Sequence, residues 1–308
     1  MDRLRRLAAH PAVKAAYYLL LLAAAAYFLF RWGDRLPEVL ARVQLRWVMA
    51  SLAVTALAGM VYSYVQYTLY RRLGAAVSYW TTFRIITISQ LGKYLPGIVL
   101  FAGNYYLLSR KAGISTVQVG SSFVISQALW MLTASLCGLP ALSLLNPVLR
   151  YTVLVLPLAL VLLIHPRFLG GLLRLAQRLA GRAQGEPLPL PEGLAVSSYL
   201  WLALLFLLNW ALAGLATWFS LRAFGPLAID AFPLALASTA LGTVAGLVAL
   251  FAPAGLGVRE GLGAVILAPA VGPEMALLSL VLLRGITAIV DILFAVMSMA
   301  IRSPRQTS

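Results

Sequence analysis

The sequence is poor in charged residues, and poorest in acidic ones. Asp and Glu together number 9 against 24 Lys and Arg, and only 11% of the chain is charged. Ordinary soluble domains contain about 25% charged residues, so the composition excludes a typical soluble domain. A net charge of +15 on a soluble protein would suggest nucleic acid. Here the basic residues mostly lie at the ends of apolar runs, where lipid headgroups are the expected partners, so we predict no nucleic-acid binding.

Cysteine and histidine are nearly absent. Cys137 is the only cysteine, which excludes an internal disulfide, and its apolar surroundings indicate packing. His10 and His165 are far apart and near the ends of apolar runs, so they support neither a metal site nor a Ser–His–Asp triad. The chain also lacks GxxxxGK[ST], HExxH, CxxC and Asp-rich diphosphate motifs, so we predict no ATP-driven engine, no metal and no cofactor.

What the sequence does contain is long apolar runs, within a composition that is 62% hydrophobic. A helix needs about 20 mostly apolar residues to cross a bilayer. The first run follows a basic N-terminus, but no small-residue cleavage site closes it, so we interpret it as an uncleaved span rather than a signal peptide. The candidate runs are 15–30, 47–70, 119–142, 150–165, 198–221, 231–252 and 274–301.

The distribution of basic residues predicts how the chain crosses the membrane. If the N-terminus is cytoplasmic and residues 83–108 enter and leave on the same side, 15 basic residues lie inside and 6 outside. If residues 83–108 crossed the membrane instead, this excess of basic residues inside would largely disappear. The positive-inside rule favours the arrangement that keeps the excess. We therefore predict a re-entrant segment there and a cytoplasmic C-terminus, in a multi-pass protein of the cytoplasmic membrane. The interior of 83–108 is also interrupted, by Gly92, Lys93, Pro96, Gly97 and Gly103.

The second half of the chain repeats this order. Residues 231–268 are predicted to be a second re-entrant pair that enters from the opposite side, before a long span at 274–301. The fold class is therefore an all-α polytopic bundle of about six full spans plus two re-entrant segments, in a single membrane domain.

The repetition suggests an inverted-topology repeat with halves 1–142 and 146–301. Two pairs of residues are 157 apart, namely Pro96 with Pro253 and Gln127 with Arg284. The tetrapeptide at 56–59 recurs at 211–214, although chance is an alternative for such common membrane residues. Paired interrupted segments in two halves indicate the midplane binding site of a transporter.

The connector at 166–182 is predicted to be an amphipathic surface helix. Its Phe and Leu residues recur at helical spacing, with arginines on another face, and residues 35–46 show the same pattern. Simple anchoring to anionic headgroups is the favoured interpretation of both.

The first candidate binding motif lies in the first re-entrant segment. Residues Lys93, Tyr94, Pro96 and Gly97 combine a cation with a helix break. Irregular backbone at membrane depth occurs only where it is buried in protein or lines a wet cavity. Lys93 would suit a phosphate there. The alternative is that Lys93 extends to the surface and the Pro-Gly pair is only a turn.

The second candidate motif combines Pro253, Gly255, Gly257, Arg259 and Glu260. Its glycines permit unusual dihedral angles and close backbone approach. Arg259 can hold a phosphate or carboxylate through two parallel hydrogen bonds. Arg259 and Glu260 are helix neighbours and do not face each other, so we expect different partners for them. The alternative is an interfacial charged pair at the end of a span.

Arg284 and Asp291 are charges within the last span, and such charges are functional candidates because they are costly in a membrane. Their seven-residue spacing places them on nearly one face. Because helical side chains lean toward the N-terminus, Arg284 points away from Asp291. We expect Asp291 to meet Lys93 or Arg259, or to titrate. Glu260 and Asp291 are candidates for proton coupling or ion pairing; a purely structural ion pair is the alternative.

At these two motifs the sequence resembles the flippase-like membrane family that includes the transmembrane region of lysylphosphatidylglycerol synthase. The similarity rests on 91–97 with Gly103, and above all on the run from Pro253 to Glu260, and extends over nearly the whole chain in span order. Ala254 departs from the expected glycine. The resemblance implies a division of labour in the synthase, in which the membrane part moves an aminoacylated lipid across the bilayer and a separate soluble domain makes that lipid. This sequence ends at Ser308 without such a domain, so we expect the translocating part alone.

The leading functional hypothesis is translocation of an anionic lipid or lipid-linked glycan through a cavity lined by the two broken segments. The alternatives are a membrane-embedded headgroup transferase, with Glu260 or Asp291 as base, and a non-catalytic partner of a lipid synthase or glycosyltransferase. The sequence favours a transporter over an enzyme and predicts no catalytic residues. It leaves open the lipid, the energy source, the direction and the oligomeric state.

Overall fold

The structure is a computed structural model of the chain. It describes residues 43–94, 99–148, 194–249 and 257–300 continuously, together with isolated residues 41, 150, 151, 153, 155, 171 and 255. Every regular element in these residues is a helix. The predicted span 15–30 and most of 150–165 lie outside the described residues. So do more than half of the predicted surface helix at 35–46 and nearly all of the one at 166–182.

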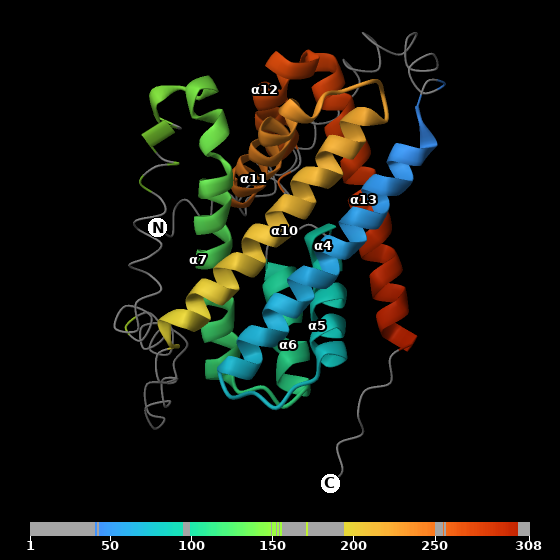
Figure 1. Cartoon of the computed structure of the whole chain (residues 1–308). Helices are drawn as coiled ribbons and strands as arrows, with labels where there is room; N and C mark the ends of the chain where they lie inside the picture. The colour runs from blue at the N-terminus through green and yellow to red at the C-terminus, as the bar shows by residue number, and fades with distance from the viewer. Residues whose placement is uncertain are drawn as a thin grey trace, which may run out of the picture.

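Four long helices cross the molecule from end to end (Figure 1). They are α4 (Leu45–Arg72), α7 (Thr116–Cys137), α10 (Val196–Arg222) and α13 (Pro273–Ala300), with 22 to 28 residues each. At 1.5 Å per residue this corresponds to about 33–42 Å, enough to cross a hydrocarbon layer of about 30 Å. They correspond to four of the six predicted full crossings.

Two shorter helical pairs enter the bundle from opposite ends and turn back near its middle (Figure 1). The first pair is α5 (Tyr79–Leu91), the 3₁₀ turn η1 (Gly92–Tyr94) and α6 (Val99–Lys111). The second is η3 (Ile229–Ala231), α11 (Phe232–Val248) and α12 (Val258–Val271). We call them hairpin 1 and hairpin 2. Their helices have 13 to 17 residues, or about 20–26 Å, so each falls short of a full crossing.

By length and composition, five stretches in the described residues could span a membrane, namely α4, α7, α10, α13 and residues 229–247 of hairpin 2. The last of these does not continue to the far end, because the chain reverses after it and α12 returns to the end where α11 begins (Figure 1). The re-entrant geometry expected for 83–108 and 231–268 is therefore present, with wider bounds of 79–111 and 229–271.

Two details of the sequence prediction were wrong. The span at 119–142 ends early, because α7 stops at Cys137 and Gly138 and Pro140 begin the 3₁₀ turn η2 (Leu139–Leu144). Gly103 was expected to interrupt hairpin 1 but lies inside α6. Gly92, by contrast, caps the C-terminus of α5 at the break itself.

Hydroxyl side chains fix where two of these helices begin. Ser78 accepts a hydrogen bond from the Thr81 amide at the start of α5. Ser115 and Gln118 form a reciprocal capping box at the start of α7. Each cap satisfies backbone donors that the first helical turn leaves without partners. The Gln118 side-chain amide also donates to the Leu73 carbonyl, so the capping box of α7 is joined to the C-terminal end of α4.

The antiparallel pair α4 and α10 forms the centre of the bundle, with α7 and α13 beside it (Figure 1). The Asn209 amide donates to the Ala58 carbonyl over 2.7 Å, and the Ser51 hydroxyl donates to the Ala216 carbonyl over 2.8 Å. In the low-dielectric interior such side-chain bonds fix the register of the two helices. Trp210 on α10 donates to the Trp130 carbonyl of α7, which fixes the third helix.

The helix contacts agree with a two-fold relation that exchanges α4 with α10 and hairpin 1 with hairpin 2. Hairpin 1 packs on α13, and hairpin 2 packs on α7; α4 packs on α13, and α10 packs on α7. This pattern is what an inverted repeat requires. The halves 1–142 and 146–301 themselves extend into residues that the structure does not describe, so they stay a prediction.

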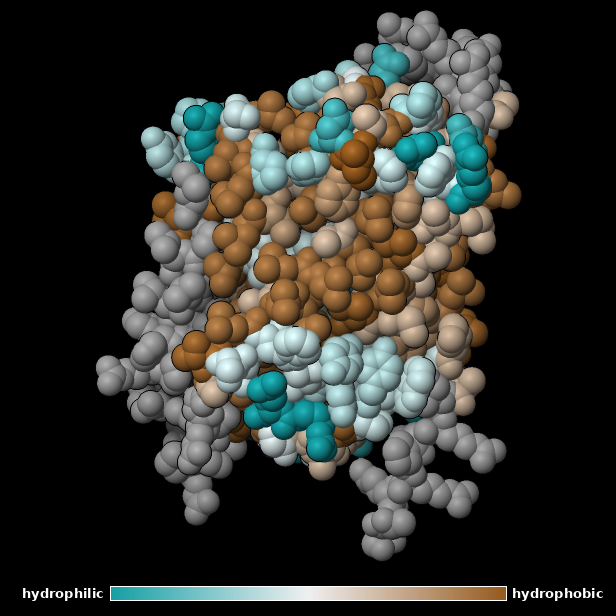
Figure 2. Space-filling view, in the orientation of Figure 1, coloured by the Kyte–Doolittle hydropathy of each residue, from teal (hydrophilic) through white to brown (hydrophobic). Residues whose placement is uncertain are grey.

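The surface has the distribution of a membrane protein. Apolar side chains form a broad band around the middle in the face shown, and hydrophilic residues gather above and below it (Figure 2). Large side chains such as Met49, Leu208, Ile289 and Val296 are exposed on the long helices. In water such a band would be a costly apolar patch, whereas in lipid it is the expected outer surface. The chain is therefore a polytopic helical membrane protein.

Candidate functional site

A cavity of about 420 Å³ lies in the interior of the bundle, where the two hairpins turn. Its wall is built from α4, α5, η1, α6, α7, α10, α11, α12 and α13, so hairpins and long helices both contribute. The volume falls within the range of about 300–1,000 Å³ that small-molecule sites occupy. Three of the predicted cations line it, namely Lys93, Arg259 and Arg284.

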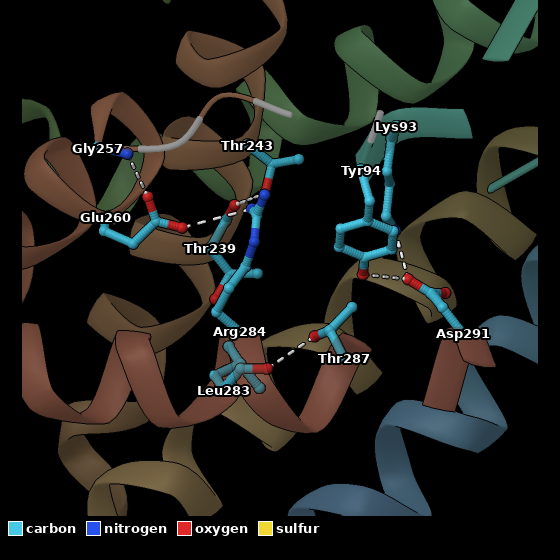
Figure 3. A network of polar contacts seen from close by, with 10 residues as sticks. All are labelled: Lys93, Tyr94, Thr239, Thr243, Gly257, Glu260, Leu283, Arg284, Thr287 and Asp291. Atoms are coloured by element: carbon cyan, nitrogen blue, oxygen red, sulfur yellow. Dashed lines mark hydrogen bonds and ion pairs between the residues drawn. The ribbon is translucent and has the colours of Figure 1, made fainter. Parts of the chain in front are cut away.

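The first charged group at the cavity joins hairpin 1 to α13. The Lys93 ammonium lies 2.6 Å from Asp291 Oδ2, and the Tyr94 hydroxyl donates to the same oxygen over 2.6 Å (Figure 3). Asp291 thus pairs with Lys93, one of its two expected cations. The Lys93 side chain is 29% exposed and that of Asp291 is 16% exposed. The pair is therefore at the cavity surface rather than sealed within the protein.

The second charged group lies within hairpin 2 and α13. Glu260 Oε2 accepts the Gly257 amide over 2.8 Å, and Glu260 Oε1 lies 3.4 Å from Arg284 Nη1 (Figure 3). A carboxylate in the first turn is favoured by the partial positive charge of the helix N-terminus. Glu260 therefore caps α12 and also neutralises Arg284, and these contacts occupy both of its oxygens.

Arg259 differs from the other charges at the cavity. Its side chain is half-buried and lines the cavity, and among the described residues it forms no ion pair and donates no side-chain hydrogen bond. Its neighbour Glu260 is directed to Arg284 and Gly257, as expected for helix neighbours that face different ways. An arginine in a membrane interior is costly, so one without a protein anion is a candidate for binding an anionic ligand.

Close glycine packing positions Arg259. A Cβ added at Gly246 would lie 3.2 Å from the Gly255 Cα, and one added at Gly242 would lie 2.7 Å from the Arg259 carbonyl oxygen. Gly255 has φ +67°, and a Cβ there would lie 2.6 Å from the Gly246 Cα. The four-residue spacing of Gly242 and Gly246 thus presents a bare strip of α11 to the backbone that precedes and begins α12. Side chains at these glycines would push Arg259 away from its observed place.

Uncharged polar side chains line the rest of the cavity, including Thr55, Gln90, Gln127 and Asn209. Gln90 and Gln127 form no hydrogen bond within the described part of the chain, and the buried hydroxyl oxygen of Thr55 also has no partner there. Buried polar groups are normally hydrogen-bonded, so the Thr55 hydroxyl is a candidate for contact with a polar ligand, and the two half-buried glutamines that face the cavity can join it.

The 157-residue offset seen in the sequence recurs in the cavity wall. Five pairs of lining residues have this separation, and each pair places one residue in each predicted half: Gly59 and Ala216, Ile86 and Thr243, Gln90 and Leu247, Gln127 and Arg284, Trp130 and Thr287. The two halves therefore contribute corresponding positions with different chemistry. The second half supplies both arginines, and the first supplies two glutamines.

The structure brings together most of the predicted site. Lys93, Tyr94, Gly255, Arg259, Arg284 and Asp291 line the cavity, and Gly257 and Glu260 form the cap beside it. Pro96, Gly97 and Pro253 lie outside the described residues. Sequence reasoning missed Thr55, Gln90, Gly242 and Gly246; only the Gly242–Gly246 spacing offered a signal. No group of three potential metal ligands occurs in the described residues.

Comparison with known proteins agrees with this architecture. The family model described as the lysylphosphatidylglycerol synthase TM region matches residues 15–295. The chain belongs to this family. The match includes both hairpins and every residue of the candidate site, and confirms the resemblance drawn from the two motifs. A comparison with curated proteins found no match.

Membership in the lysylphosphatidylglycerol synthase TM family connects the chain to lipid metabolism in a membrane. The family description names a membrane region associated with a lipid synthase. The description does not by itself identify the lipid headgroup that this chain binds. The charges and polar groups of the cavity wall are independent evidence on the headgroup.

Proposed function

We propose that the protein translocates an anionic lipid between the two leaflets of the cytoplasmic membrane, with the headgroup bound in the cavity. The observation that carries the proposal is Arg259, which lines a cavity in the membrane interior without a protein anion among the described residues. Arg284 and Lys93 add positive charge to the same wall. Together with Tyr94, Gly255 and the backbone turn at Gly257, they form the proposed binding site.

The balance of charge supports an anion as the ligand. The described cavity wall contains three cations, Lys93, Arg259 and Arg284, and one carboxylate, Asp291, with Glu260 behind Arg284. A phosphate bound at Arg259 would offset this excess and accept charge-assisted hydrogen bonds. The N-terminus of α12 begins immediately before Arg259, and its partial positive charge favours the same ligand.

The arrangement of the hairpins supports movement rather than static binding. Broken helices that enter from opposite faces and meet at mid-depth are typical of transporters in which a central site opens to each side in turn. A headgroup transferase would instead need a carboxylate available as a base. Asp291 already accepts two donors and Glu260 already accepts Gly257 and Arg284, so neither is poised for that role.

We further propose that both termini face the cytoplasm and that a separate synthase or glycosyltransferase supplies the lipid. The basic residues Arg71, Arg72, Arg84, Arg110 and Lys111 gather at the end where hairpin 1 enters, in agreement with the positive-inside rule.

The test is translocation by purified protein in phosphatidylcholine vesicles that contain fluorescent phosphatidylglycerol, with dithionite to bleach the outer leaflet. We expect the protein to accelerate exchange, and Arg259→Ala to slow it about 10- to 100-fold, as loss of a charged hydrogen bond predicts. Arg259→Lys should retain part of the rate. Arg46→Ala is the matched control, since Arg46 is exposed and its described contacts are with Gln44 and the Trp47 ring, neither of which lines the cavity.

A chain that accelerates exchange of no anionic phospholipid, although it elutes as a folded species, would contradict the proposal. Equal rates for the native protein and Arg259→Ala would reject the assigned binding site.

A further inference from the structure

The cavity has charged walls on the hairpins and α13 and uncharged walls elsewhere. On α13, Arg284 and Phe294 both line it and are ten residues apart, which is about 15 Å along the helix. Arg284 lies at the hairpin 2 end with Glu260 and Arg259. Phe294 lies against Gly59 of α4, since a Cβ at Gly59 would be 2.9 Å from its ring. The cavity therefore extends from the arginines, past the Lys93–Asp291 pair, to Gly59.

The walls that α4, α7 and α10 contribute to the cavity are polar but uncharged. Asn209 bonds to the carbonyl of Ala58, next to Gly59, and Trp210 bonds to the Trp130 carbonyl, one turn from Gln127. Gln127 of α7 and Thr55 of α4 line the cavity on helices that pack against each other. Among the described lining residues of α4, α7 and α10, none is charged.

Hydrogen-bonding capacity remains on these uncharged walls. The Thr55 hydroxyl oxygen is buried and has no partner in the described residues, and the half-buried Gln127 amide forms no hydrogen bond there. An amide and a hydroxyl each donate and accept, which matches the hydroxyl groups of a polyol or sugar. A ligand with only a phosphate would leave the buried Thr55 hydroxyl without a partner, at a cost in free energy.

A positively charged headgroup would find no free carboxylate in the described wall. Both carboxylates near the cavity are already engaged, Asp291 by Lys93 and Tyr94, and Glu260 by Arg284 and Gly257. An added ammonium group would meet three cations and would have to displace one of these contacts. The cavity thus disfavours the lysyl group that appears in the family description.

We propose that the transported lipid carries a phosphate joined to an uncharged, hydroxyl-rich group, and that Thr55 and Gln127 bind that group while Arg259 and Arg284 bind the phosphate. This inference rests on the proposed function and specifies its substrate class. The separation of about 15 Å between Arg284 and Phe294 along α13 leaves room for a phosphate and a ring-sized polyol side by side.

The test compares three acyl-labelled probes in phosphatidylcholine vesicles: phosphatidylinositol, phosphatidic acid and lysylphosphatidylglycerol. We expect the native protein to move phosphatidylinositol fastest and lysylphosphatidylglycerol slowest. Gln127→Leu and Thr55→Val should each lower the ratio of phosphatidylinositol to phosphatidic acid transport about three- to tenfold, the effect of one lost hydrogen bond.

Thr133→Val is the matched control. Thr133 lies on α7, is buried, bonds to the Leu129 carbonyl of its own helix and does not line the cavity. Its substitution should leave the ratio unchanged. Elution and melting temperature of each variant separate misfolding from altered selectivity.

The outcomes distinguish the two proposals. An unchanged ratio in both Gln127→Leu and Thr55→Val, or fastest transport of lysylphosphatidylglycerol, overturns the substrate class while translocation stands. Absence of transport for all three probes overturns translocation and the substrate class together.

Discussion

The contact between Lys93 and Asp291 gives a quantitative prediction for the stability of hairpin 1. Asp291→Asn removes the carboxylate that Lys93 and Tyr94 share and leaves Lys93 without a counter-ion. Breaking a fully buried ion pair costs about 3–5 kcal/mol, whereas exposed pairs contribute about 0–1 kcal/mol. Lys93 is 29% exposed, so we expect an intermediate cost of about 1–2 kcal/mol.

The three single variants should differ in a defined order. Lys93→Met leaves Asp291 with its bond to Tyr94, and should cost less than Asp291→Asn. Tyr94→Phe removes one neutral donor and keeps the ion pair, so about 0.5–1 kcal/mol is expected. The double variant Lys93→Met/Asp291→Asn removes both charges, and should be more stable than Asp291→Asn alone by about 1 kcal/mol.

The measurement is thermal unfolding of purified protein in detergent, followed by tryptophan fluorescence. One kcal/mol corresponds to a shift of about 2–4 °C in melting temperature for chains of about 150–250 residues, and slightly less for this one. Glu274→Gln serves as control, because Glu274 lies exposed in the first turn of the same helix and should cost at most about 0.5 kcal/mol. Additive effects of the two single substitutions in the double variant would refute the assigned pairing.

Two further predictions concern hairpin 2. Gly255→Ala should destabilise the protein by at least about 1–2 kcal/mol and reduce translocation, because φ is +67° there and the added Cβ would lie 2.6 Å from the Gly246 Cα. Gly261→Ala is the control and should be neutral or stabilising, because its Cβ would lie in open space. An equal loss of stability in both variants would contradict the packing argument. Glu260→Gln should lower the melting temperature yet keep translocation measurable, since Glu260 acts as cap and counter-ion; loss of translocation with an unchanged melting temperature would instead indicate proton coupling.

Where charge is rare, the sequence pointed to residues that the structure brings together at the cavity. Lys93, Arg259, Arg284 and Asp291 were recognisable because an ionisable residue in an apolar run is costly and needs a reason to be there. The positive-inside count also predicted the re-entrant form of hairpin 1, although α5 and α6 are individually apolar enough to resemble parts of a span. These inferences depend on local composition, which a single sequence contains.

Features that depend on contacts between distant segments were less accessible. Thr55 is an ordinary hydroxyl residue in an apolar helix, and only its buried position beside the cavity makes it notable. The importance of Gly246 depends on its close contact with Gly255, which lies between α11 and α12. The prediction for Gly103 was wrong because a helix tolerates a glycine in an apolar stretch. Open space surrounds Gly103, so no close contact with a neighbouring segment explains a glycine at this position.

The meeting of the two hairpins near mid-depth also has an electrical consequence. A membrane potential of 100 mV is worth about 2.3 kcal/mol for each elementary charge that crosses it completely. A singly charged headgroup held between the hairpin tips would have crossed about half of that potential. In a cell whose interior is negative, outward movement of an anion would thus be driven by voltage at both steps, and the direction of transport would follow from the sign of the headgroup charge.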